Sequence, residues 1–109
     1  MNEQEEALKK MRAAAFIRNN GRVLRVINIL RHKYESLEDI QCALDNLDER
    51  HFLDCIHFLS EAGYIHLREM GSRETANLAD ADYKRLEAKV TAQGIRLLGG
   101  EIQDKMVDA

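Results

Sequence analysis

The spacing of apolar residues predicts helices in the first third of the chain. Apolar positions recur at steps of three and four from residue 3 to 18, and again from residue 22 to about 33. Between these stretches lies Asn-Asn-Gly at 19–21, and asparagine and glycine tolerate the left-handed conformation that ends many helices. The pattern therefore predicts two helices with a break between them.

Two more helices and a pair of strands are expected next. Ser36 and Asp48 are good N-caps for a third and a fourth helix, and Gly63 suits the end of the fourth. Beyond Gly63, apolar and polar residues alternate at 65–68 and again at 85–90, which is the spacing of strands. The long polar stretch between these strands predicts a β-hairpin with an extended tip.

A last helix is expected over residues 92–107. Thr91 can cap it, while Gly99-Gly100 introduces a kink or a frayed turn. The apolar stripe of this helix consists of Ile95, Leu98, Ile102 and Met106.

This order of elements is that of the winged helix-turn-helix. Residues 59–65, Leu-Ser-Glu-Ala-Gly-Tyr-Ile, resemble the L-x-E-x-G-(L/Y)-I passage by which many bacterial winged-helix regulators leave the recognition helix. Residues 90–98 resemble their (L/V)-T-x-x-G-x-x-L-L step into the final helix. The chain is thus similar to bacterial and phage winged helix-turn-helix regulators, among them small winged-helix proteins of Mu-like prophages. The resemblance implies a single mainly α domain with a small β-hairpin, its core at 22–98 and its flanking helices at 3–18 and 92–107.

The resemblance also implies how such a protein acts. In these regulators the helix before the wing enters the major groove, while the wing and an earlier helix contact phosphates. It implies a non-enzymatic, cytoplasmic regulator of transcription that binds duplex DNA without a cofactor. The residues that it places in the groove are Arg50, Leu53, Asp54 and His57, and those that it places on phosphates are Arg22, Arg25, Arg68 and Arg73.

The charge pattern argues that the acidic fourth helix cannot by itself hold DNA strongly, and that the basic block before it is better placed to do so. The net charge is −3, but residues 7–34 carry eight cations and no carboxylate, whereas residues 35–61 carry eight carboxylates and only Arg50 as a cation. Much of non-specific DNA affinity comes from lysine and arginine that displace counterions. Carboxylates near phosphates work against it, by ~0.5–1 kcal/mol each.

Two other interpretations of the charges remain open. Asp48 and Glu49 are favourable at a helix N-terminus whatever the helix binds, because of the macrodipole. The basic block can also neutralise the acidic block within or between subunits. The alternative function is therefore a winged helix that binds protein, with its acidic fourth helix docked on a basic partner.

Other chemistries find little support in the sequence. His51, Cys55 and His57 lie close together and Cys42 is nearby, but single thiols do not form the paired spacing of a metal site, so no metal is expected. No candidate nucleophile is paired with a base, and there is no phosphate loop. No apolar run approaches the length of a membrane helix, and no signal peptide is recognisable.

The terminal helices predict a homodimer. Their apolar stripes exceed what three helices and a hairpin need, and such appendages commonly form a two-fold interface. The alternative is that the first helix packs on the last within one chain. The residues assigned to the dimer interface are Leu8, Met11, Ile95, Leu98, Ile102 and Met106.

Overall fold

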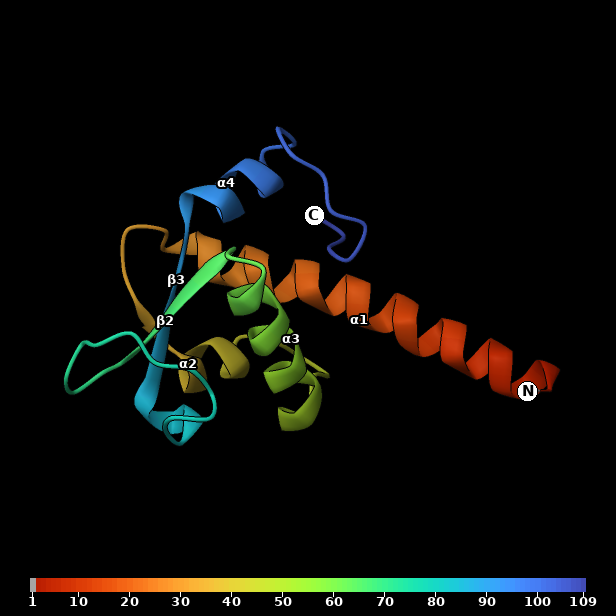
Figure 1. Ribbon diagram of the computed structural model, residues 1–109, viewed down its shortest axis with the longest axis horizontal. Coiled ribbons are helices and arrows are strands. Elements are labelled where there is room, and N and C mark those ends of the chain that lie inside the picture. Colours follow the sequence, from red (N-terminus) through yellow and green to blue (C-terminus); the bar gives the residue numbers. More distant parts are fainter. Residues whose placement is uncertain (1) are drawn as a thin grey trace.

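The computed structural model describes residues 2–109, and its longest element is the helix α1, Glu3–Ile29 (Figure 1). This helix runs without interruption through Asn-Asn-Gly at 19–21, so the predicted break and the separate helices 3–18 and 22–33 are wrong. The local signal is overridden because Asn20 and Gly21 are buried against another part of the chain. The N-terminal half of α1 projects away from the rest of the molecule.

The next two helices begin at the caps that the sequence predicts. Helix α2, Leu37–Cys42, is capped by Ser36, and α3, Glu49–Glu61, is capped by Asp48. Each cap side chain accepts a hydrogen bond from the backbone N–H three residues on, at 3.1 and 2.8 Å. Gly63 follows the end of α3 with a φ of +82°, which a residue with a side chain rarely adopts.

The sheet has three antiparallel strands in the order β1-β3-β2. Strands β2, Ile65–Glu69, and β3, Leu86–Val90, form the predicted hairpin, with Leu67 opposite Ala88. Strand β1, Glu35–Ser36, was not predicted because a two-residue strand has no period to detect. The mainly helical class with a small hairpin is confirmed at this level, with one strand more than expected.

A long connection joins β2 to β3 through residues 70–82, here called the tip segment, and a short 3₁₀ helix, Tyr83–Arg85. The backbone N–H of Glu69 in β2 donates to the Glu74 carbonyl at 2.9 Å, and that of Ala76 donates to the Leu67 carbonyl in β2 at 3.2 Å. The tip segment therefore covers part of the outer edge of β2. An open strand edge attracts other strands, so this cover protects the sheet.

The last helix, α4, spans Ala92–Leu98 and is shorter than predicted. Gly100 has a φ of +81° and turns the chain, so the expected helix over 92–107 ends at Leu98. Residues 99–109, here called the tail, then fold back over the middle of α1 (Figure 1). Val107 in the tail is only 6% exposed and belongs to the hydrophobic core.

The core lies between α1, α3 and the sheet. The buried face of α1 meets that of α3, and β2 and β3 alternate buried and half-buried residues. The largest fully buried side chains are Leu24, Ile27, Leu37, Phe52, Ile56, Leu59 and Leu86. None of the helices described between residues 2 and 109 is long and apolar enough to cross a membrane.

Candidate functional site

The four residues assigned to a DNA groove lie together on one side of α3. Arg50, Asp54 and His57 are exposed and Leu53 is half-buried. Glu61 lies on the same side one helical step further on, and these five residues are here called the outer face of α3. The outer face carries one arginine against two carboxylates, and its one apolar side chain, Leu53, lies at its flank and packs partly against the core.

Asp48, at the start of α3, has a structural role. Its carboxylate accepts from the backbone N–H of His51 at 2.8 Å and lies 2.6 Å from Nδ1 of the same residue. The backbone hydrogen bond first, and then the side-chain one, lower the pKa of Asp48 below its usual value. The carboxylate therefore stays ionised and caps the helix, which agrees with the helix-terminus interpretation of this residue.

Two of the arginines assigned to phosphates make hydrogen bonds within the chain. Arg22 donates to the backbone carbonyl of Asp45 at 2.6 Å and so ties α1 to the turn between α2 and α3. Arg25 donates to the backbone carbonyl of Asp108 at 2.7 Å and so ties α1 to the tail. Both acceptors are neutral carbonyls, and a guanidinium has five N–H donors, so each arginine keeps its positive charge and has donors left over.

The other two assigned arginines differ from one another. Arg68 forms an ion pair with Glu87 at 2.7 Å, and its guanidinium lies 3.5 Å from the centre of the Tyr34 ring, a cation–π arrangement. Arg73 is exposed in the tip segment with a φ of +60°. Within residues 2–109, Arg73 is thus the member of this set whose side chain has no protein partner.

The residues assigned to a dimer interface do not form one surface. Leu8 and Met11, on the projecting half of α1, are 46% and 67% exposed. The remaining four lie on α4 or the tail, where Met106 is partly exposed and the others pack on the core; these are Ile95, Leu98, Ile102 and Met106. The alternative, in which the first helix packs on the last, is realised in part, but by the tail rather than by a helix.

The attachment of the tail is the feature that sequence reasoning missed. The side-chain N–H of Asn20 donates to the Met106 carbonyl at 2.9 Å, while its other polar atom, Oδ1, is buried without a partner. A Cβ on Gly21 would lie 1.9 Å from the carbonyl oxygen of Asp108, so only glycine allows this approach. The signal was present, because an asparagine and a glycine within a helix often mark a close contact.

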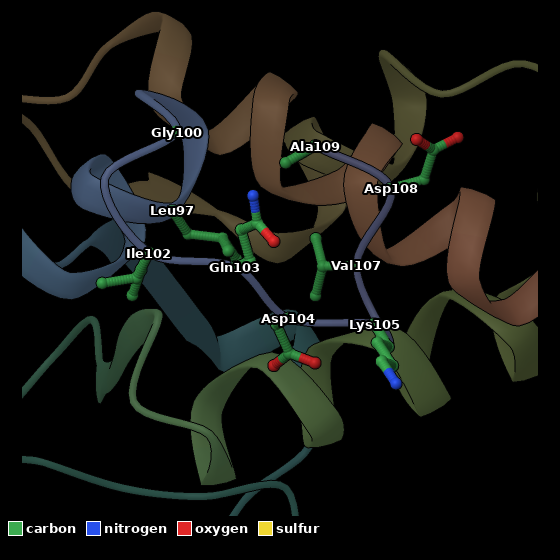
Figure 2. A pocket seen from close by; sticks show the side chains of 9 residues that line it. All are labelled: Leu97, Gly100, Ile102, Gln103, Asp104, Lys105, Val107, Asp108 and Ala109. Carbon is green, nitrogen blue, oxygen red and sulfur yellow. The ribbon is translucent and has the colours of Figure 1, made fainter.

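The tail and the end of α4 line an open pocket of about 360 Å³ (Figure 2). Leu97, Gln103 and Val107 point toward its centre, whereas Asp104 and Lys105 point away. Asp104 instead accepts a hydrogen bond from the hydroxyl of Tyr64 at 2.5 Å. The pocket forms where the tail folds back, and the polar side chains that line it do not converge on one point.

Neither cysteine belongs to a metal site. Cys55 is buried, and the loss of hydration raises the pKa of its thiol to about 12. Cys42 is exposed. Among residues 2–109 there is no group of three or more histidine, cysteine, aspartate or glutamate side chains placed to hold a metal ion.

In comparisons with models of protein families, with curated proteins and with solved structures, the chain matches none of them. What this protein binds must therefore be argued from the outer face of α3 and the charges around it.

Proposed function

We propose that this chain is a non-enzymatic binding module of the winged-helix type, whose α3 docks on a basic, partly apolar segment of another protein. The order of the elements supports the class: three helices, a hairpin and a closing helix, with the helix before the hairpin exposed along one side. Winged helices serve both protein and DNA recognition, so the site must decide between the two.

The observation that carries the proposal is the charge that α3 presents. Asp54 and Glu61 are exposed on the outer face, and Arg50 is the only cation there. Arg68 is neutralised by Glu87, and Arg22 and Arg25, which keep their charge, lie on α1 rather than on α3. A face with two exposed carboxylates and a half-buried leucine at its flank complements a segment that carries lysine-like and leucine-like side chains.

The test uses a fluorescently labelled synthetic peptide composed of leucine and lysine residues. The peptide is titrated with the full chain, and binding is followed by fluorescence anisotropy. Binding is expected at low salt, and the double variant Asp54→Lys with Glu61→Lys is expected to lose it. The matched control, Glu74→Lys with Glu101→Lys, changes the net charge equally but away from α3 and is expected to keep binding. Equal loss in both variants would mean that only net charge is sensed, which would refute docking at α3.

A second candidate function is the DNA-binding regulator of transcription. The observation that favours it is the pair of exposed arginines at the two places where a winged helix touches DNA: Arg50 on α3 and Arg73 at the tip. If duplex DNA is the ligand, replacing Arg73 with alanine should lower the slope of log affinity against log salt by about one. An unchanged slope would exclude that phosphate contact.

A further inference from the structure

We propose that two copies of the chain associate through an antiparallel pairing of their α1 helices. In this pairing the projecting N-terminal half of each α1 lies along the C-terminal half of the partner's α1, beside α2. The surface is distinct from the outer face of α3, so the inference does not depend on what α3 binds.

An apolar stripe along α1 is the first observation. Leu8, Met11 and Ala15 recur at steps of three and four on the projecting half, and Val26 and Ile29 continue the same line on the C-terminal half. Leu8, Met11 and Ile29 are 46%, 67% and 74% exposed. Ala15 and Val26 are half-buried, and Val26 packs partly against the core, so the uncovered part of the stripe is formed by Leu8, Met11 and Ile29.

The C-terminal half of the stripe borders a groove. Two open pockets adjoin there, and both are lined by Val26, Ile29 and Ala43, so the groove lies between α1 and α2. The more apolar of the two has a volume of about 180 Å³ and is also lined by Leu30, which is 49% exposed, and by Ile40. An apolar helix stripe is the shape and chemistry that such a groove accepts.

One register matches apolar with apolar toward both ends of α1. If Leu8 lies opposite the partner's Ile29, then Met11 falls opposite the partner's Val26, and Ala15 falls opposite the partner's Arg22. The small Ala15 leaves room for the stem of that arginine, whose head is held by the Asp45 carbonyl. Because the pairing is two-fold, each of these contacts occurs twice.

The same register brings opposite charges together. The acidic first turns, Glu3, Glu5 and Glu6, fall opposite the basic stretch that follows the end of the partner's α1, formed by Arg31, His32 and Lys33. The positive end of one helix dipole also meets the negative end of the other. This complementarity selects the antiparallel orientation.

The extent of the pairing suits a stable dimer. A helix of 27 residues is about 40 Å long, and pairing along all of it buries on the order of 1,000 Å² or more in total, which is where specific interfaces begin. Pairing of the projecting halves alone would bury roughly half of that. The full-length register is therefore the one that the area favours.

The first test is sedimentation velocity of the full chain at micromolar concentrations. The wild-type chain is expected to be a dimer, and Met11→Glu and Ile29→Glu are each expected to weaken it about tenfold or more. Both side chains are largely exposed in the single chain, so circular dichroism should show an unchanged fold. Met70→Glu, at another exposed methionine, is the matched control and should leave the dimer intact. A wild-type chain that stays monomeric would overturn the proposal.

The second test fixes the register by cross-linking in a Cys42→Ala background. Arg18 lies next to the two-fold axis, so Arg18→Cys should be joined to its own copy by a short bismaleimide. Leu8→Cys should not, because in this register its counterpart lies 21 residues along the helix, about 32 Å away. Cross-linking of Leu8→Cys instead would show that only the projecting halves pair, and would overturn the register.

Discussion

Replacement of Gly21 by alanine tests whether the tail is attached to α1. A Cβ at this position would lie 1.9 Å from the Asp108 carbonyl oxygen and 2.7 Å from its carbonyl carbon. Both atoms belong to the backbone, so the tail rather than a flexible side chain must move. The tail would then leave α1 at the place where Asp108 donates its N–H to the Ile17 carbonyl at 3.2 Å.

The free energy change has opposing contributions. Alanine is a better helix former than glycine and by itself stabilises a helix by about 1 kcal/mol. Against this, loss of the tail exposes Val107, at a cost of about 2 kcal/mol, and removes the bonds from Asn20 to Met106 and from Arg25 to Asp108, at about 1 kcal/mol each. The freed tail regains conformational entropy, which offsets part of the loss. The expected net effect is destabilisation by about 1–2 kcal/mol.

The assay is urea denaturation of four chains: the wild type, Gly21→Ala, the chain truncated after Lys105, and the truncated chain with Gly21→Ala. In the truncated chain the clash is absent, so the same substitution should stabilise by about 0.5–1 kcal/mol. Attachment of the tail at Gly21 therefore requires that Gly21→Ala lowers the free energy of unfolding of the full chain and raises that of the truncated chain. If Gly21→Ala stabilises both chains equally, the tail is not attached at Gly21 and the reasoning is refuted.

Two further predictions concern buried polar groups. Burial, and then the hydrogen bond to Asp104, raise the pKa of Tyr64 from 10.0 to about 12. The stabilisation that the neutral hydroxyl contributes to the fold is therefore fully present below pH 10 and is lost as the pH rises toward 12. Tyr64→Phe should therefore cost about 1–2 kcal/mol at pH 8 and much less at pH 12 by urea denaturation, and an equal cost at both would contradict the bond. Iodoacetamide should alkylate Cys42 alone in the native chain and both thiols in denaturant, because burial raises the pKa of Cys55 to about 12. Two adducts on the native chain by mass spectrometry would disprove this.

The features that could be predicted from the sequence are those set by neighbouring residues. Ser36 and Asp48 cap their helices because a short acceptor side chain reaches the N–H three residues on, a bond that needs no distant partner. The strands 65–69 and 86–90 follow from the alternation of apolar residues over one buried face. Local chemistry determines such elements, so they can be inferred without knowledge of the fold.

The features that were missed depend on distant contacts. Gly21 has the local character of a helix stop, but its role is to let Asp108, 87 positions away, approach the helix. The pairing of Arg22 with the Asp45 carbonyl and of Arg68 with Glu87 likewise joins separate parts of the chain. The sequence shows that these arginines exist, but not that the fold already uses them. Which of their hydrogen-bond donors the fold occupies could be learned only from the structure.

The measurement that bears most directly on the proposed function is the titration of mixed-sequence duplex DNA with the full chain at about 50 mM and 200 mM salt. If α3 presents an acidic surface to a basic protein segment, no binding of DNA is expected at either concentration. Micromolar affinity at the lower salt that falls steeply at the higher would contradict the account and favour the regulator of transcription.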